Sequence, residues 1–476
     1  MRRSVPVPVN VAGFRFVVCA FALLVGCQPT SEILVHVDTD APVPPRAGSD
    51  FDPNYPPWLF DRLRVDILRD GAPVARREFA VDQGLFLDGK VSFGVAPPVG
   101  DRSFTARLRL YRGDHTLDPD PQPTASLDTT IALPPVDDSS RADVSVFLRT
   151  EDVGTAIGPI APTPGLPGAS QASTWPGATI VPCNGDPRDD EVCVPGGAFW
   201  MGDPYLRGIV NGEDADRERL VVLSPFFIQT QPMTVAKFRA FFGQTVDGYD
   251  NQEWNELEDP TQFASWCTFT PGPSAADPSD AHGALALNCV TYVNASHYCR
   301  IQYGGNFPSE AQLEFVASGR GLENAYPWGG DDPACGDSIW GWGGIGETYG
   351  TVPDCRDNAR TDVVTIPGTG TRDRIAYPDG GGRTIVDLAG NLAQFTADLW
   401  SRQDEAYWSK PGVFTDPVAD LVSPADGPLR VARGGAFYDV PLESRAGFRR
   451  PIEQYDSQMR SEYYYGAGFR CARPAL

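Results

Sequence analysis

The sequence predicts two domains of different class: a small all-β sandwich, and after it a loop-rich α+β domain tied together by disulfides. Three observations lead to this prediction. Apolar and polar residues alternate with period two before residue 150, a Pro/Gly/Ser-rich stretch follows, and the rest combines short amphipathic helices with eight of the ten cysteines. With 476 residues, 41% hydrophobic and 21% charged, the chain is long enough for two or three domains with cores of their own.

The charge balance limits the partners of the protein. The chain has 39 Lys and Arg residues against 62 Asp and Glu residues, a formal net charge of −23. Phosphate groups are bound by basic surfaces, so we expect neither nucleic acid nor direct binding to anionic lipid. The composition is typical of an acidic, exported protein.

The N-terminus predicts an export signal over residues 1–27. Basic residues precede an apolar run from Phe16 to Gly26, which is too short for an ordinary membrane span. The run ends in Leu-Val-Gly-Cys, which resembles the lipobox of bacterial lipoproteins and implies acylation of Cys27 and a membrane anchor. Gln28, rather than Asp, follows the cysteine, which favours the outer membrane of a Gram-negative bacterium. The alternative is a plain signal peptide with an incidental cysteine.

Residues 31–150 are predicted to form the β-sandwich, with antiparallel strands. Clear alternation occurs in the stretches 62–67, 104–110 and 143–148, and Asp70-Gly71 is typical of a hairpin turn. This region contains no catalytic grouping, so we interpret it as a spacer or a partner-binding module. Residues 151–180 carry little charge and many Pro, Gly, Ser and Ala residues, which indicates an exposed linker.

The second domain, residues 181–476, is predicted to contain three short helices. Thr234 and Thr291 precede apolar helical patterns as N-caps, and Ser309 and Gln312 have the spacing of a capping box. Long loops dominate after Gly321. Such loops usually carry function or need covalent staples.

Eight cysteines remain after the predicted signal, and an even number in an exported protein indicates disulfides. Metal binding is the rival interpretation. The cysteines form no C-x-x-C pair and the four histidines are scattered, so a zinc site is not expected.

Seven sequence blocks in the second domain resemble the sulfatase-modifying-factor family, whose founding members are formylglycine-generating enzymes. They are, in order, CVPGGAFWMGD (193–203), LSPFFIQTQPMTVAKFRAFF (223–242), CVTYVNASHYCRIQYGGNFPSEAQLEFVASGRG (289–321), YPWGG (326–330), VDLAGNLAQFTADLW (386–400), RVARGGAFYD (430–439) and GAGFRCARP (466–474). The resemblance implies a variant C-type-lectin-like α+β fold and a disulfide between Cys299 and Cys471. Nearest-neighbour pairing gives the remaining three disulfides as Cys183–Cys193, Cys267–Cys289 and Cys335–Cys355.

The resemblance also shows where the chemistry of the family is missing. Family enzymes oxidise a sulfatase cysteine with oxygen and Cu(I), held by two cysteines in the loop after the R-G-G motif. Those positions correspond to Asp439 and Ser444 here, and neither replaces a thiolate for a soft Cu(I) ion. Copper and a catalytic residue are therefore not expected. The alternative is that Cys335 or Cys355 reaches the loop as a free thiol. Relatives that use histidine-bound iron have a further helical domain, which this chain lacks.

Calcium is the second metal that the resemblance implies. The family pattern D-x-x-G-N-x-x-E corresponds to residues 387–394, so Asp387, the carbonyls of Gly390 and Leu392, and Gln394 in place of the usual Glu form a weakened calcium site. The alternative is that Asp387 and Asn391 only hydrogen-bond a tight loop.

A ligand cleft is predicted beside the R-G-G loop, with Phe437, Tyr438, Arg445, Tyr463 and Tyr464 as its candidate residues. Ordinary packing of these aromatic residues is the alternative. Trp328, Trp340 and Trp342 could stack on a sugar, but in a loop-rich fold the core is the favoured place for them.

Three functions remain open from the sequence. The leading hypothesis is a non-enzymatic envelope lipoprotein whose second domain binds a peptide, protein or glycan. The others are a formylglycine-generating oxidase with atypical ligands and a purely structural envelope component.

Overall fold

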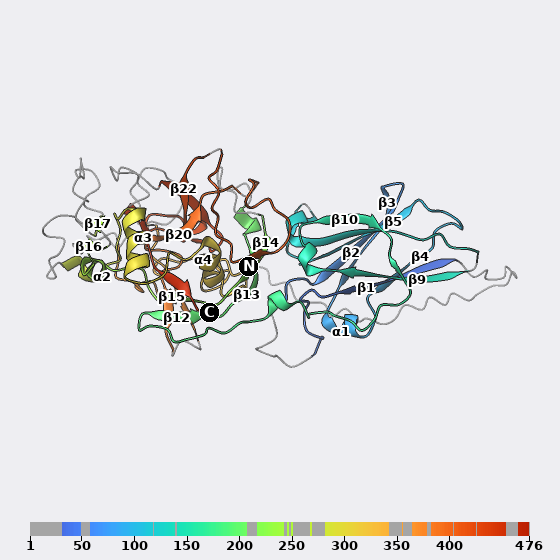
Figure 1. Ribbon diagram of the computed structural model, residues 1–476, viewed down its shortest axis with the longest axis horizontal. Helices are drawn as coiled ribbons and strands as arrows, with labels where there is room; N and C mark the ends of the chain where they lie inside the picture. Colours follow the sequence, from blue (N-terminus) through green and yellow to red (C-terminus); the bar gives the residue numbers. More distant parts are fainter. Residues whose placement is uncertain are drawn as a thin grey trace.

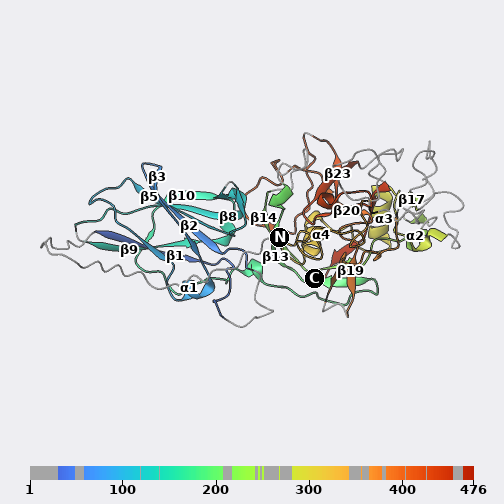
Figure 2. The same ribbon diagram turned by 180° about the vertical axis from the view of Figure 1, so that it is seen from behind.

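The protein is elongated, with a β-domain at one end and a mixed domain at the other (Figures 1 and 2). The computed structural model describes residues 31–48, 58–117, 119–138, 140–206, 217–241, 245–246, 249–250, 267–268, 281–341, 355, 364–377, 382–402, 404–424, 426–453 and 465–475. The predicted signal, with Cys27, lies outside these residues. Among the described residues, no helix is both long and apolar enough to cross a membrane.

Two sheets pack face to face in the β-domain. One has the strand order β11 (Thr163–Pro164), β9 (Arg141–Leu148), β1 (Glu32–Thr39) and β4 (Ser92–Val95). The other has the order β10 (Ala156–Ile160), β8 (Ser126–Ala132), β5 (Phe104–Tyr111), β2 (Arg62–Arg69) and β3 (Ala72–Ala80). Short elements connect them: α1 (Gln83–Leu87), β6 (Thr116–Leu117) and β7 (Asp120–Pro121).

The alternating residues of the sequence form the core between these sheets. Leu63 and Val65 of β2 and Leu108 and Leu110 of β5 are buried. Asp70 and Gly71 both have positive φ at the turn between β2 and β3, as the hairpin prediction requires.

Two expectations about the β-domain were wrong. The sheets are mixed, because β1 pairs in parallel with β9, and β8 in parallel with β10. Residues 151–180 are no free linker either, since β10 and β11 from this segment close one edge of each sheet. Their prolines are tolerated because edge strands have one unpaired side. Trp175 from the same segment is 4% exposed, and its Nε1 donates to Glu151 at 2.7 Å.

The second domain has few helices and several small sheets. Three sheets have the strand orders β12-β15-β25, β13-β14-β21 and β23-β22-β20-β24, and β18 and β19 form a hairpin, as do β16 and β17. The strands are β12 (Glu191–Val194), β13 (Gly197–Met201), β14 (Arg219–Leu223), β15 (Phe226–Gln229), β16 (Thr245–Val246), β17 (Tyr249–Asp250), β18 (Arg374–Ala376), β19 (Thr384–Val386), β20 (Ala393–Leu399), β21 (Phe414–Thr415), β22 (Leu429–Arg433), β23 (Arg449–Glu453), β24 (Ala467–Gly468) and β25 (Ala472–Pro474).

The three predicted helices are present and begin at the predicted caps. They are α2 (Val235–Arg239), α3 (Tyr292–Ile301) and α4 (Glu310–Ala317). The N-caps are Thr234, Thr291 and Ser309, and the capping box of Ser309 and Gln312 is complete. Each cap oxygen satisfies a backbone N–H that the first helical turn leaves without a partner.

Four disulfides tie this domain: Cys183–Cys193, Cys267–Cys289, Cys299–Cys471 and Cys335–Cys355. These are the pairs given by the resemblance and by nearest-neighbour pairing. Cys299 lies on α3 and Cys471 immediately precedes β25, so this disulfide joins the middle of the domain to its end.

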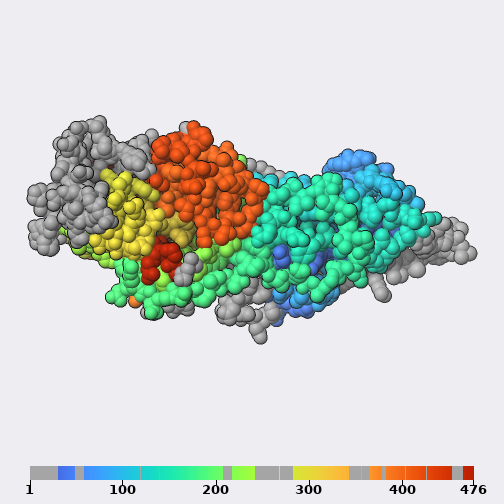
Figure 3. Space-filling model, viewed as in Figure 1, coloured from blue at the N-terminus to red at the C-terminus, as the bar shows by residue number. Residues whose placement is uncertain are grey.

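The two domains share a packed interface. Trp200 of β13 belongs to the same core as Phe60 of the β-domain, and its Nε1 donates to the carbonyl of Leu59 at 3.0 Å. On the surface, the segment around Gly412 meets the β-domain (Figure 3), and its amide donates to the carbonyl of Val153 at 2.8 Å.

Candidate functional site

The R-G-G loop begins where β22 ends and turns sharply at Gly434. Gly434 has a φ of 78°, and a Cβ there would lie 2.6 Å from the carbonyl oxygen of Leu388, so no other residue fits. Phe437 follows and is 1% exposed, with its amide donating to the carbonyl of Asn391 at 3.0 Å. The loop is thus packed against the segment that precedes β20.

Asp439 and Ser444, at the two predicted copper positions, lie inside the domain, 2% and 1% exposed. Asp439 forms a buried ion pair with Arg450 of β23, and it accepts a hydrogen bond from the amide of Ala436 at 2.6 Å. The hydroxyl of Ser444 has no hydrogen-bond partner among the described residues. A carboxylate that neutralises a guanidinium and a lone hydroxyl do not fit Cu(I), which prefers thiolates.

Glu443 adds a second acidic group to this buried cluster. Burial, together with the charge of Asp439, raises the pKa of Glu443 to about 7. Its carboxylate also accepts a hydrogen bond from the amide of Val440 at 3.2 Å.

No cysteine of the described chain offers a thiolate to this loop. Cys335 and Cys355, the two candidates for an atypical copper site, are joined to each other in a disulfide.

The predicted calcium ligands form hydrogen bonds within the protein. Asp387 accepts from the side chain of Asn391 at 2.9 Å and from the amide of Gly368 at 3.0 Å. The carbonyl of Gly390 accepts from the amide of Leu392 at 2.9 Å, and the carbonyl of Leu392 accepts from the side chain of Gln394 at 2.6 Å. The side-chain oxygen of Gln394 lies 3.4 Å from Nε of Arg470. Each predicted ligand group therefore accepts a hydrogen bond from the protein.

Arg470 supplies the positive charge of this loop. Its guanidinium is fully buried and donates to the carbonyls of Val386 and Asp387 at 2.8 and 2.7 Å. Burial and the neighbouring carboxylate of Asp373 also raise the pKa of Asp387 to about 7. These contacts are the ones expected for a hydrogen-bonded loop, the alternative to the calcium site.

Of the predicted cleft residues, the structure describes Phe437, Tyr438 and Arg445, and these three do not line one hollow. Phe437 is buried, the ring of Tyr438 packs against Gly466, and Arg445 lines a cavity at the boundary of the domains. Tyr463 and Tyr464 lie outside the described residues, as does Trp342. Trp340 is 1% exposed, as expected for the core, and Trp328 stacks on Tyr326 with ring centroids 5.0 Å apart.

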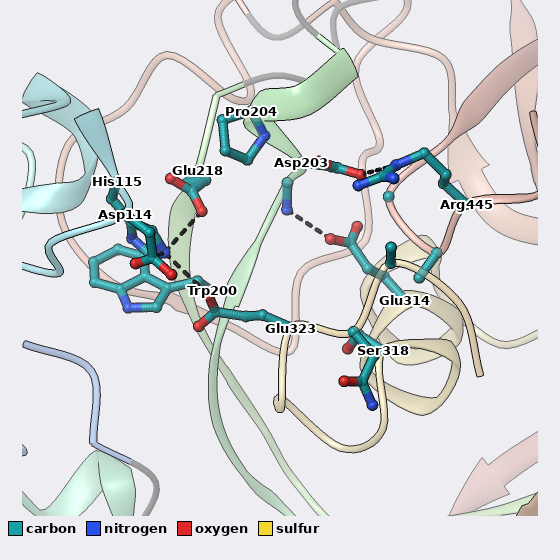
Figure 4. Close-up of a pocket in the computed structure, with 15 residues that line it drawn as sticks. Asp114, His115, Trp200, Asp203, Pro204, Glu218, Glu314, Ser318, Glu323 and Arg445 are labelled. Carbon is teal, nitrogen blue, oxygen red and sulfur yellow. Dashed lines mark hydrogen bonds and ion pairs between the residues drawn. The ribbon is translucent and has the colours of Figure 1, made fainter. Parts of the chain in front are cut away.

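The cavity at the domain boundary has a volume of about 170 Å³ and an acidic lining (Figure 4). The β-domain contributes Asp114 and His115, and the second domain contributes the other walls. The acidic residues among those walls are Asp203, Glu218, Glu314 and Glu323.

His115 lies between two carboxylates that belong to the other domain (Figure 4). Its Nε2 is 2.9 Å from Glu218 and 3.0 Å from Glu323, and the side chain is 2% exposed. Burial alone would lower the pKa of His115, but the charges of Glu218 and Glu323 outweigh it and raise the pKa to about 10. The ring also packs edge-to-face on Trp200, with centroids 5.2 Å apart.

The opposite wall of the cavity is held by ion pairs of its own. Arg445 donates to Asp203 at 2.6 Å and lies over the ring of Tyr205 at 4.5 Å. Glu314 of α4 accepts from the amide of Gly202 at 2.6 Å and pairs with Arg433 at 2.8 Å.

A larger hollow, of about 500 Å³, lies within the second domain alone. The start of β15, the loop before α4 and the strand β25 surround it, and Phe307, Val418 and Pro474 give it a largely apolar wall. Asn306, Gln312 and Arg473 place polar groups at the same hollow. A concave site with an apolar wall and a few polar groups is the usual form of a ligand pocket.

No local pattern in the sequence predicts either hollow. His115, Glu218 and Glu323 are separated by about a hundred residues each and come together only because the two domains pack on one another. Only the adjacency of Asp114 and His115 is visible in the sequence.

The fold and these sites define a class: a β-sandwich packed on a strand-rich, disulfide-tied domain with a buried Asp and Ser at the predicted copper positions. Residues 178–475 match the family described as sulfatase-modifying factor enzyme 1-like domain, and the chain belongs to this family.

Among curated proteins, the chain is 28% identical over 318 residues to a formylglycine-generating enzyme of Thermomonospora curvata, covering 60% of this chain and 93% of that protein. It is 24% identical over 304 residues to the mouse (Mus musculus) protein named inactive Cα-formylglycine-generating enzyme 2, covering 60% and 85% of the two chains. Among solved structures, PvdO from Pseudomonas aeruginosa is similar with a TM-score of 0.36 and 19% identity, over 60% of this chain and 94% of that one.

Proposed function

We propose that the protein is an envelope-anchored lipoprotein whose second domain is a non-catalytic member of its family and binds a peptide, protein or glycan. One observation carries the loss of catalysis. Both copper positions hold residues without a thiol, Asp439 and Ser444, while all eight cysteines after the predicted signal are joined in disulfides. A thiolate-bound Cu(I) ion therefore has no ligands at the place where the family reaction occurs.

The binding role is supported by the hollow of about 500 Å³ between β15, β25 and the loop before α4. Its apolar wall and few polar groups fit a side chain or sugar better than a metal ion. The name of the mouse relative, an inactive formylglycine-generating enzyme, shows that loss of activity occurs among similar proteins. A variant C-type-lectin-like arrangement of the domain is part of this proposal.

The anchor and the metals belong to the same proposal. Acylation of Cys27 would hold the protein at the outer membrane. The proposed binding role requires neither copper nor calcium. Copper has no thiolate ligands, and Arg470 provides the positive charge at the loop where calcium would be expected.

An oxidation assay tests the loss of catalysis. The purified lipoprotein is incubated with Cu(I), oxygen and a sulfatase peptide that contains the target cysteine, with the Thermomonospora curvata enzyme as positive control. We expect no formylglycine above background and no free thiol in the unfolded, unreduced protein. Formylglycine production that depends on copper would show that the domain is an oxidase with atypical ligands.

A pair of valine variants tests the binding role. Val418 lines the hollow and is 43% exposed, whereas Val422 is 51% exposed and lies outside the lining. Peptide and glycan arrays are probed with wild type, Val418→Arg and Val422→Arg. We expect a ligand that wild type and Val422→Arg bind, and that Val418→Arg has lost. No ligand on any array, or equal binding by all three proteins, would favour a structural envelope component.

A further inference from the structure

The boundary between the domains contains a cluster of metal-ligating groups outside the R-G-G and calcium-type loops. Asp114 and His115 come from the loop after β5, Glu218 lies just before β14, and Glu323 lies in the loop after α4. The ligating atoms of Asp114, His115 and Glu323 all lie within 4.8 Å of one another. Glu218 also approaches His115 Nε2, at 2.9 Å.

Three carboxylates of this cluster approach the same ring nitrogen. Nε2 of His115 carries at most one proton, but it faces carboxylate oxygens of Glu218 at 2.9 Å and Glu323 at 3.0 Å, with Asp114 at 3.7 Å. A single N–H therefore serves one carboxylate well, and apart from it the carboxylates have only their contacts with Arg112 and Gln122. A metal ion accepts all of these groups at the same time. Two ligands on a metal with bonds of about 2.1 Å lie about 3 Å apart at right angles and about 3.4 Å apart at the tetrahedral angle. The three distances from Nε2 to the carboxylates, 2.9, 3.0 and 3.7 Å, lie around these values.

The net charge of the cluster also favours a divalent cation. Among the ion pairs of the described residues, Asp114 pairs with the guanidinium of Arg112 at 3.3 Å, and Glu323 pairs with the same guanidinium. Glu218 is the third carboxylate of the cluster. With a neutral His115, these four charged side chains sum to about −2. A divalent ion balances that charge at a place where His115 and Glu218 are almost fully buried.

The surroundings hold the ligands in place. The side-chain amide of Gln122 donates to the second oxygen of Glu218 at 2.7 Å, which fixes the orientation of that carboxylate. Such outer-shell hydrogen bonds are a regular feature of metal sites in proteins. The adjoining cavity of about 170 Å³ leaves room for water on the open side of the ion.

We propose that this cluster binds a divalent transition-metal ion of the Zn²⁺ or Mn²⁺ type through Nε2 of His115 and carboxylate oxygens of Glu218, Glu323 and Asp114. An imidazole nitrogen among carboxylate oxygens suits these ions better than Ca²⁺, which takes oxygen ligands, or Cu(I), which takes sulfur. Because the ligands come from both domains, the ion joins the β-sandwich to the second domain and fixes their relative orientation.

Metal analysis of the intact lipoprotein, purified in detergent without a histidine tag, tests this site. The chelator-treated protein is titrated with Zn²⁺, Mn²⁺ and Ca²⁺ by calorimetry, and the metal retained after dialysis is measured by mass spectrometry. We expect about one equivalent of Zn²⁺ or Mn²⁺ to be retained, with at least tenfold weaker binding of Ca²⁺. His115→Gln and Glu323→Gln should each weaken the transition-metal affinity at least tenfold.

His36→Gln is the matched control, since His36 also pairs with a carboxylate, Asp143, at 3.1 Å. His36 lies on β1, an inner strand of the sheet that does not contain β5. This variant should keep the affinity of wild type. If His115→Gln fails to fold, as judged by circular dichroism, Glu323→Gln decides the question. The proposal is overturned if wild type retains less than about a tenth of an equivalent of metal after dialysis. It is also overturned if the folded cluster variants bind metal as tightly as wild type does. In either case His115 would be an imidazolium that only pairs with the carboxylates.

Discussion

Asp439 stabilises the buried guanidinium of Arg450. This contact gives the acidic residue a structural role at a position where the family reaction needs a thiol. Arg450 is 6% exposed and is paired with Asp439. Burial and the charge of Asp439 also raise the pKa of the neighbouring Glu443. The position therefore serves stability in this chain.

Replacing Asp439 by Asn should lower the free energy of unfolding by about 3 kcal/mol, because the variant leaves Arg450 buried without its full counter-charge. Urea denaturation followed by circular dichroism measures the loss. Asp404→Asn, at an exposed position, is the control and should change stability by less than about 0.5 kcal/mol. A loss below about 1 kcal/mol for Asp439→Asn would mean that the ion pair contributes little.

The loop around Asp387 yields a prediction about calcium. Since its oxygens are occupied by donors of the protein and Arg470 lies against its carbonyls, millimolar Ca²⁺ should leave the melting temperature unchanged within about 1 °C. Differential scanning calorimetry with and without Ca²⁺ checks this. A rise of several degrees that disappears in Asp387→Asn would instead establish a calcium site.

Residue identities predicted much of the second domain, but not the cluster at the domain boundary. Helix caps are local, so Thr234, Thr291 and Ser309 could be assigned from neighbouring residues alone. The sequence places Asp439 and Ser444 at the two expected copper positions, and the structure shows both side chains buried. The contact of His115 with Glu218 depends on how two domains pack, and no local pattern encodes it.

At the level of elements, the disulfide between α3 and the start of β25 closes the largest loop of the domain. Cys299 and Cys471 are 172 residues apart, whereas Cys183 and Cys193, beside β12, are separated by 10. In the chain-entropy description, a longer closed loop restricts the unfolded state more strongly.

Removing the two disulfides separately should therefore have unequal effects. Cys299→Ser with Cys471→Ser should lower the free energy of unfolding by about 4–5 kcal/mol, and Cys183→Ser with Cys193→Ser by about 2–3 kcal/mol. Urea denaturation of both double variants compares them directly. A larger loss for the Cys183–Cys193 pair would show that native-state packing, rather than loop entropy, dominates.

The strands of the β-domain show what periodicity encodes and what it leaves open. Alternation predicts which side chains of β2 and β5 face the core, because successive residues point to opposite faces. It does not give the partner or direction of a strand, so the parallel pairing of β1 with β9 was missed. The edge strands β10 and β11 were missed because they contain Pro159 and Pro164, which are typical of linkers.

At the scale of the molecule, the β-domain is part of one packed body with the second domain. A single apolar core runs from Phe60 to Trp200, and backbone hydrogen bonds such as that from Gly412 to Val153 cross the boundary. A tether between an anchor at Cys27 and a binding domain would need no such core. The packing indicates that the β-domain presents the second domain in a fixed orientation.

Buried acids in the second domain make the stability of the whole molecule depend on pH. Burial raises the pKa of Asp398 to about 7, helped by the charge of Glu310, and the pKa of Glu443 is raised to about 7 by burial and Asp439. A carboxyl group with a raised pKa in the folded state stabilises the fold while it is protonated, and this contribution is lost as the pH rises through 7. Groups with a lowered pKa, such as Asp426 at about 2, stabilise the fold fully above pH 5. They therefore do not change the free energy of unfolding with pH in that range.

The free energy of unfolding should therefore fall between pH 5.5 and pH 8.5, by on the order of 2 kcal/mol for each buried acid whose pKa is raised to about 7, Asp387 included. Urea denaturation across this range measures the slope. Glu443→Gln isolates one contribution, because its amide resembles the protonated acid and can donate to Asp439. We expect this variant to show a shallower slope than wild type and to exceed wild type in stability at pH 8.5. Stability that rises over the same range, or an unchanged slope in Glu443→Gln, would show that Glu443 is ionised in the folded protein at neutral pH.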